Sequence, residues 1–492
     1  MHTRRPLPPP KRGAPNSPPP ASLGLGFHPP PSFLTRLYPS HTADAFNAFH
    51  TGTNAHSLLD RFLVGEVERR PEDKVVSKTE FEREYRELGM TLRAEGMMKA
   101  KCVGCCGEGN PPRAPAVAAP RSHPHSPSRR PAPHCSRSLF FYAYKFASTT
   151  ALLALSAWVT STAAAQGSVL GQLLGAVVLA FFWQQCGWLA HDFGHHQVFK
   201  SRFLNDCGIL LVGNLYQGFS NEWWKNKHNT HHAVPNLLES AEGALDGDPD
   251  IDTLPFLAWS SAMLRKAVAR AGSGTVPLAL RYQAVIYFPI LFFARLTWAL
   301  QSAQFVYRFN LGMFDNNEGA VREKMAKQAG AAKPQGLKYE AAEKALIAAH
   351  YAGCAALCLG CTSSLAMGLA HFALAQTLCG LLLAVAFGVG HNGMAVFEPA
   401  TRPAYGELQV ATTRNVDNDA LGLTGWFMGG LHVQIEHHLY PAVPRHNLEA
   451  IRPRVQALCK KHGVPYHSTS LLQGTVEVLA HLDHVVKDFP AA

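Results

Sequence analysis

Three histidine clusters are the parts of this sequence best suited to do chemistry. They read HDFGHH, HNTHH and QIEHH, and they contribute His191, His195 and His196, then His228, His231 and His232, then Gln434, His437 and His438. Residues three or four positions apart share one face of a helix, so each cluster predicts two or three side chains directed at one point. Neutral imidazole is the commonest metal ligand among side chains. The spacing therefore predicts a metal site built from all three clusters.

The number of imidazoles narrows the kind of metal site. Imidazole suits zinc, copper, iron and nickel, so the ligand type alone does not identify the metal. A tetrahedral zinc takes four ligands, fewer than these clusters supply, whereas two adjacent ions of higher coordination would use them. A redox-active pair beside a bilayer favours dioxygen chemistry on lipid, because acid–base groups cannot break an unactivated methylene C–H bond. We therefore predict a pair of irons.

Membrane-spanning helices are expected to position the clusters. The 492 residues are 47% apolar and only 16% charged, against about a quarter charged in soluble proteins. Four apolar runs, at 146–165, 168–190, 345–367 and 370–390, are each close to the roughly 20 residues that cross a bilayer. They predict two hairpins, the first leading into His191 and the second into His391. Basic residues before the first hairpin place this side in the cytosol.

A fifth apolar stretch, 282–307, decides whether all clusters lie on the same side. Arg281, Arg295 and Arg308 divide it into short uncharged pieces, and Pro289 interrupts the first piece. Each piece is too short to span, which predicts an interfacial helix lying flat. Four crossings then leave every histidine cluster on the cytosolic side. The net charge of +10 fits an anionic membrane face better than nucleic acid.

The clusters and their flanks resemble those of the membrane fatty-acid desaturases. The matching segments are WQQCGWLAHDFGHHQVF (183–199), GFSNEWWKNKHNTHHAVPN (218–236), GHNGMAVF (390–397) and TTRNV with GGLHVQIEHHLYPAVPRHNL (412–448). Gln434 at the start of the third cluster is similar to the front-end desaturases, where other members have histidine. The resemblance implies an O2-dependent enzyme that inserts a cis double bond between an existing one and the carboxyl end of an acyl chain.

The resemblance also implies a set of iron ligands. These are His191, His195, His196, His228, His231, His232, His437 and His438, with His391 as a further ligand. Gln434 would either bind iron or orient a neighbour. His432 departs from the asparagine usual in the family, as an added ligand or an inert substitution.

The stretch from His28 to His50 resembles the haem-binding half of a cytochrome b5 domain, whose axial ligands these two histidines would be. The HPGG of that family is HPPP here, and rigid proline rings replace a turn that glycine permits. Either the segment is a remnant that binds no haem b, or the chain has lost or substituted its true start. In the first case a separate cytochrome b5, with cytochrome b5 reductase, would supply electrons.

The sequence thus predicts a mainly α protein: a four-span bundle of two hairpins with a cytosolic histidine cap, preceded by a partial cytochrome b5-like segment. The predicted regions are a basic proline-rich tail (1–25), the haem-like segment (26–95), a linker or insert (96–137), the desaturase domain (138–470) and a C-terminal tail (471–492).

The sequence is compatible with several functional alternatives. The flank of the first cluster favours the Δ6 position, with the acyl chain carried by a phospholipid or by coenzyme A. Alternatives are Δ8 desaturation of sphingolipid long-chain bases and hydroxylation on the same scaffold. A histidine-rich metal transporter is disfavoured because transport needs polar ligands within the spans. The resemblance implies the endoplasmic reticulum, while the acid-poor N-terminus leaves a plastid membrane as the alternative.

Overall fold

The computed structural model describes residues 79–98, 137–240, 246–272, 274–309 and 338–489. The candidate haem ligands His28 and His50 and the predicted tail 1–25 lie outside these ranges. The described chain is mainly helical, as predicted. Its two strands, β1 (Asn415–Val416) and β2 (Ser468–Thr469), form a parallel pair with Asn415 opposite Ser468.

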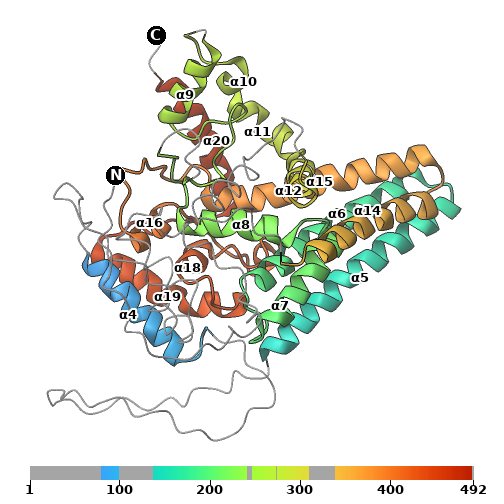
Figure 1. The fold of residues 1–492 in the computed structure, drawn as a ribbon, viewed down its shortest axis with the longest axis horizontal. Coiled ribbons are helices and arrows are strands. Elements are labelled where there is room, and N and C mark those ends of the chain that lie inside the picture. The colour runs from blue at the N-terminus through green and yellow to red at the C-terminus, as the bar shows by residue number, and fades with distance from the viewer. Residues whose placement is uncertain (1–78, 99–136, 241–245, 273, 310–337, 490–492) are drawn as a thin grey trace, which may run out of the picture.

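Four long helices extend together from the rest of the molecule (Figure 1). They are α5 (Arg137–Ala165), α6 (Val169–Gly194), α14 (Glu340–Cys361) and α15 (Leu365–His391). The α5–α6 and α14–α15 turns meet at the far end, where the Ser363 backbone N–H donates to Gln172 Oε1 at 2.9 Å. Each hairpin therefore returns the chain to the side that carries the histidines.

Three of these helices, α6, α14 and α15, are long and apolar enough to cross a membrane. The predicted first span also forms a helix, α5, but hydroxyl side chains make it less apolar. Ser156, which is fully buried, donates to the Gly175 carbonyl of α6 at 2.7 Å. No room remains for a Cβ at Gly175, which lies against Thr160. The hydroxyls of α5 thus bond to backbone in a close helix–helix contact.

After α6 the chain runs back along that helix and then reverses. It forms α7 (Arg202–Ile209), the π-helix η2 (Leu210–Gln217) and α8 (Asn221–Ala233). Gly208 packs on Phe193, and Tyr216 contacts Phe182 with ring centroids 5.5 Å apart. The reversal occurs at Gly218, whose φ of +81° suits glycine. As a result α8 points back towards the end of α6.

The fifth apolar stretch differs from a single helix lying flat. After α9 (Ser261–Ala271) and α10 (Leu278–Arg281), it forms α11 (Gln283–Leu291) and α12 (Ala294–Tyr307), bent relative to each other by 63°. Tyr287 lies against Gly388, the bend at Leu291 lies against Gly380, and Trp298 contacts Phe387. The pair therefore passes down α15 and turns back, with both ends on the histidine side.

A cap of shorter helices covers the other end of the molecule (Figure 1). It contains α4 (Glu80–Ala94), α16 (Tyr405–Ala411), α17 (Leu423–Phe427), α18 (Gln434–Leu439) and α19 (Arg445–His462). The Tyr85 hydroxyl of α4 donates to the Leu439 carbonyl at 2.9 Å, and the Tyr440 hydroxyl donates to the Tyr85 carbonyl at 3.0 Å. Helix α4, within the range assigned to the haem-like segment, thus shares a core with the third histidine cluster.

Residues 471–487, which the sequence analysis places in a tail, form helix α20 (Leu471–Lys487). Ser470 caps its first turn by accepting from Gln473 N at 3.2 Å. Val478 and Leu482 are buried against α9 and α11. The apolar face of this amphipathic helix therefore packs against α9, α11 and α15.

Candidate metal centre

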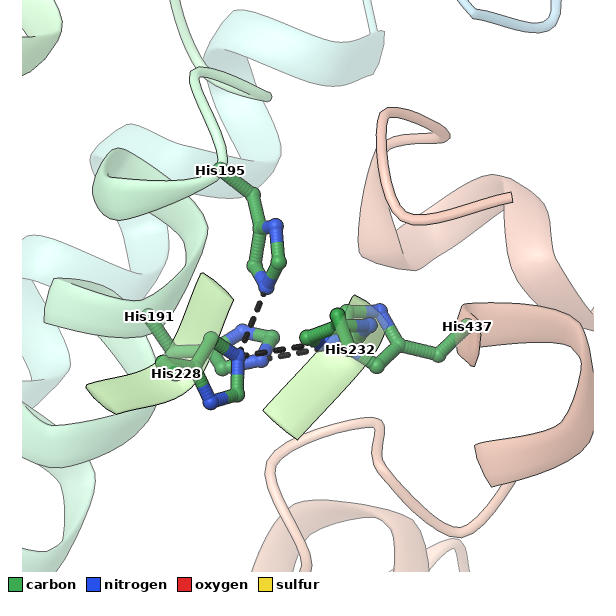
Figure 2. Close-up of side chains that lie close together, drawn as sticks. All are labelled: His191, His195, His228, His232 and His437. Carbon is green, nitrogen blue, oxygen red and sulfur yellow. Dashed lines mark hydrogen bonds between the residues drawn. The ribbon is translucent and has the colours of Figure 1, made fainter. Parts of the chain in front are cut away.

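Five histidines from distant parts of the chain converge on one point. Their candidate ligand atoms all lie within 4.8 Å of one another, and Figure 2 shows the rings meeting between α6, α8 and α18. The Nε2 atoms are 3.1 Å apart for His191 and His437, and 2.9 Å apart for His195 and His228. His232 Nε2 lies 3.1 Å from His437 Nε2. We call this set the five-histidine group.

Three further histidines form a second cluster beside the first. His231, His391 and His438 also have ligand atoms within 4.8 Å of one another. His231 Nε2 lies 3.3 Å from His391 Nε2. The rings of His438 and His232 stack with centroids 4.2 Å apart, so the two groups are adjacent. This second set is the three-histidine group.

Helix geometry explains how the second and third clusters each serve both groups. Helix α8 begins after Ser220, whose side chain accepts from Trp223 N and caps the first turn. His228 and His232 are one turn apart and enter the five-histidine group, whereas His231 enters the other. On α18 the consecutive residues His437 and His438 point in different directions, at about 100° per residue. One histidine of that pair therefore reaches each group.

Hydrogen bonds at Nδ1 leave the three-histidine group ready to bind metal through Nε2. His231 Nδ1 lies 2.9 Å from Asp248 Oδ2, and His438 Nδ1 lies 2.9 Å from Gln409 Oε1. His391 Nδ1 lies 3.2 Å from the Thr412 carbonyl. All three partners are acceptor oxygens, so the proton resides on Nδ1 and Nε2 carries the lone pair that a metal would use. At His391 the Gln434 amide nitrogen lies 2.7 Å from that Nε2.

Burial keeps most of these imidazoles neutral. It lowers the pKa of His195 to about 3 and holds the pKa values of His228, His232 and His437 well below the usual range. His231 differs: burial lowers its pKa, but the Asp248 carboxylate outweighs burial and the pKa is raised. Metal binding requires an unprotonated ring nitrogen. His195, His228, His232 and His437 are therefore already in the protonation state that can bind a metal.

The donor set fits two metal ions. His438 Nε2 is buried and makes no hydrogen bond with the described residues, and such an unsatisfied buried atom calls for an explanation. In the five-histidine group, the Nε2 atoms of neutral rings lie within hydrogen-bonding distance of one another. Each neutral imidazole carries only one N–H, so there are too few donors for all of the lone pairs. One metal ion per group would satisfy these nitrogens, and an all-imidazole set suits iron, copper, zinc or nickel.

Not every predicted site residue enters the two groups. Helix α6 ends at Gly194, and His196 leaves it with a φ of +57°, which places its Nε2 3.5 Å from Asp206 Oδ1. His432 Nε2 lies 2.6 Å from Glu449 Oε1. Gln434 does reach the three-histidine group, with its side-chain nitrogen 2.7 Å from His391 Nε2. Gln434 therefore lies at the site. His196 and His432 lie outside the two histidine groups, beside acidic side chains.

Asp248 is a site residue that the sequence reasoning missed. It is buried, and its Oδ2 also accepts from the Asn236 backbone N–H at 2.7 Å. Together with Asp250 and His231 it forms a third potential metal-binding set. The alternating acids of DGDPDID were a visible signal, but local spacing could not show that one of them reaches a histidine of the second cluster.

A cavity of about 1240 Å³ adjoins the histidine groups. His228, His231 and His391 form part of its wall, and α11 and α12 contribute Leu291 and Leu296. Trp223 on α8 lines it as well. This volume exceeds the roughly 300–1,000 Å³ of common ligand pockets, so an extended apolar molecule can lie beside the candidate metals.

Comparisons with known proteins agree with this geometry. A model of the fatty acid desaturase family matches residues 168–470. The chain is 31% identical over 463 residues to an acyl-lipid (9-3)-desaturase of Physcomitrium patens, covering 94% of this chain and 72% of that protein. It is 27% identical to the Delta(6)-fatty-acid desaturase fat-3 of Caenorhabditis elegans, covering 94% and 93% of the two chains.

A Delta(8)-fatty-acid desaturase of Euglena gracilis is 33% identical over 311 residues, which covers 63% of this chain and 66% of that protein. The resemblance drawn from the histidine clusters is confirmed by a family match that includes all of them. This chain belongs to the fatty acid desaturase family.

Proposed function

We propose that this protein is a front-end acyl desaturase that inserts a cis double bond into polyunsaturated fatty acyl chains, with the Δ6 position favoured. The observation that carries the proposal is the pair of adjacent histidine groups opening onto one large cavity. In this reaction O2 accepts two electrons from the substrate's C–H bonds and two from a donor, and leaves as two waters.

We propose two irons as the resident metals. Their proposed ligands are His191, His195, His228, His232 and His437 in one group and His231, His391 and His438 in the other. Bound irons would supply the activation of O2 that side chains cannot provide. Within this scheme the chain holds the imidazoles neutral by burial, fixes His231 through Asp248, and presents the acyl chain from the cavity.

The remaining predicted residues receive other roles in this proposal. Gln434 lies next to the metal-binding nitrogen of His391, with its amide nitrogen 2.7 Å from Nε2, and so forms part of the wall of the three-histidine group. His196 positions the end of α6 against Asp206, which also binds Lys225 of α8 at 2.9 Å.

The Δ6 assignment is supported by the flank of the first cluster and by one relative whose name states that position. Other relatives are named for Δ8 and Δ5. Δ8 desaturation of sphingolipid bases and hydroxylation therefore stand as the competing outcomes of the test.

The proposed setting is the endoplasmic reticulum membrane, with four spans and the histidine groups on the cytosolic side. A plastid membrane is the alternative. Cytochrome b5 reductase would supply electrons through a separate cytochrome b5, because the HPPP sequence after His28 lacks the glycines of a haem-binding turn.

Expression in a yeast that lacks polyunsaturated-acyl desaturases tests the proposed function. Cells are fed linoleate, α-linolenate or longer polyenes, and the double-bond positions of the products are determined by mass spectrometry. We expect Δ6 products from the wild type and none from His437→Ala, which loses a member of the five-histidine group. Only Δ8 sphingoid bases or hydroxylated products would replace the assignment with the corresponding alternative, and no new product from any substrate would refute the enzyme.

A further inference from the structure

A short segment of the cap lies beside the second half of α6, a helix long and apolar enough to cross a membrane. It comprises residues 418–427 and ends in α17. The Trp426 carbonyl accepts from Gln185 Nε2 at 3.2 Å, and the Phe427 carbonyl accepts from Trp188 Nε1 at 3.0 Å. The rings of Trp426 and Phe181 have centroids 5.8 Å apart. These contacts fix the position of α17 along α6.

That position is within the apolar layer. Helix α6 begins at Val169 after the far turn, and about 20 residues span the hydrocarbon core, so its apolar part extends to about residue 188. Phe181 and Gln185 precede that limit by roughly 10 and 5 Å at 1.5 Å per residue. The contacts of Trp426 therefore lie inside the hydrocarbon layer.

Side chains satisfy several backbone groups at both ends of this segment. Asp419 Oδ1 accepts from the backbone N–H groups of Leu421 at 2.9 Å and Leu423 at 3.1 Å. At the other end, α6 donates a second side-chain hydrogen bond to Phe427, from Gln184 Nε2 at 3.3 Å. Irregular backbone at membrane depth is tolerated where protein covers it, and α6 provides that cover at the Trp426–Phe427 end of the segment. Gln184 and Gln185 are both buried, and the carbonyls of Phe427 and Trp426 accept from their side-chain nitrogens.

The outward side chains of the segment are apolar and uncovered. Leu421 is 82% exposed, the highest value among the large apolar side chains of the described residues, and Leu423 is 60% exposed. From the depth of the contacts and the apolar outer face, we propose that residues 418–427 insert into the bilayer and that Leu421 and Leu423 contact lipid acyl chains. The polar start at Asn418 and Asp419 then lies at the headgroup level.

This insertion would set the depth of the third histidine cluster. Gly429 follows the segment with a φ of +61° and lies against Trp188, where a Cβ has no room. His437 is ten residues beyond Phe427. The inserted segment thus fixes the loop before α18 against α6, the helix that carries His191, independently of which reaction the protein catalyses.

Lipid photo-crosslinking of the intact protein tests the proposal. The full chain is reconstituted in nanodiscs of phosphatidylcholine that carries a diazirine in its acyl chain, and adducts are mapped by mass spectrometry. We expect adducts on 421–423 and on the exposed Leu170 and Leu174 of α6, but none around Arg454 and Lys461 on α19. Adducts on α6 with none on 418–427 would overturn the proposal.

Two variants make the test specific. In the double variant Leu421→Glu, Leu423→Glu we expect adducts on the segment to fall roughly tenfold, because carboxylates are expelled from hydrocarbon. Met90→Glu is the matched control, since Met90 is 61% exposed on α4 in the cap; its adduct map should equal that of the wild type. Cross-links between two copies at 418–427 in place of lipid adducts would assign this face to self-association and refute insertion.

Discussion

At the scale of single residues, the site depends on which ring nitrogen carries the proton. Acceptor oxygens from Asp248, Gln409 and Thr412 hold the Nδ1 proton of three histidines. Burial removes the charged form elsewhere, as in His195. The chain therefore prepares its ligands before metal arrives, through partners that the histidine spacing does not reveal.

This arrangement predicts a difference in metal content between two histidine variants. His437→Ala removes a member of the five-histidine group, so we expect purified protein to lose at least half of the about two irons per chain expected for two closely spaced sites. His196→Ala is the matched control from the first cluster, and its iron content should stay at the wild-type level. Iron is measured by plasma mass spectrometry on folded, monodisperse protein. Equal iron loss in both variants would contradict the assignment of His196 to Asp206.

At the scale of elements, the side chain of one buried arginine joins two segments that reverse direction within the helical bundle. These are the α7–η2 segment and the α11–α12 pair. Arg295 of α12 is fully buried and donates to the Gln217 carbonyl of η2 at 2.7 Å. It also donates to Gln376 Oε1 of α15, and its guanidinium carbon lies 3.9 Å from the centre of the Trp183 ring. A buried cation persists only with such partners.

Replacement of Arg295 should therefore destabilise the packing of α12 against η2 and α15. Arg295→Met leaves the Gln217 and Gln376 acceptors unpaired, at a cost of about 1–3 kcal/mol each. We expect a drop in Tm on the order of 5 °C in detergent, allowing for partial relaxation. Arg281→Met, at an exposed arginine of α10, is the control and should leave Tm unchanged. An unaltered Tm in Arg295→Met would mean that the contacts of this guanidinium are dispensable.

Local sequence patterns predicted the long helices and most of the histidines that the structure brings together. They failed for features whose geometry depends on contacts between residues far apart in the sequence. The spacing rule treated His191, His195 and His196 as one helical face, yet α6 ends at Gly194 and His196 turns away. The bend between α11 and α12 depends on packing against Gly380, which lies far along the chain. The same is true of α20, whose apolar stripe has a partner only in the folded molecule.

At the scale of the whole molecule, the described helices define two ends. The α5–α6 and α14–α15 turns lie at one end, and the histidine groups, α4 and α19 lie at the other (Figure 1). Both ends of the α11–α12 pair are on the histidine side, where the Tyr307 hydroxyl donates to the Lys344 carbonyl at 2.8 Å. This arrangement predicts on which side of the membrane each connecting segment lies.

Glycosylation mapping in microsomes checks that sidedness. An acceptor sequon on a long flexible insert should be modified when placed at Gln166–Gly167 or at 362–364. The same insert placed between α12 and α14 should remain unmodified if α11 and α12, whose ends both lie on the histidine side, form a re-entrant pair as proposed. Modification at the last position would show that the bent pair is a true span.

The source of electrons is a second question for the whole chain. We expect the purified protein to show no haem absorbance and to need added cytochrome b5 and its reductase for turnover, since proline replaces the glycines after His28. Removal of residues 1–78 should then leave turnover unchanged, because α4 and the two histidine groups are retained. A Soret band lost on His50→Ala would instead show that the chain carries its own haem.

The separation of the ligands along the chain has a consequence for biosynthesis. His191 and His437 touch in the folded protein although 246 positions separate them, and the C-terminal third of the chain must leave the ribosome before either group is complete. A premature stop codon between the first hairpin and the third cluster would yield a polypeptide that keeps the hairpin but lacks His437 and His438, and with them part of both histidine groups. Loading of the proposed irons would thus be a late maturation event that quality control could use to distinguish finished from unfinished chains.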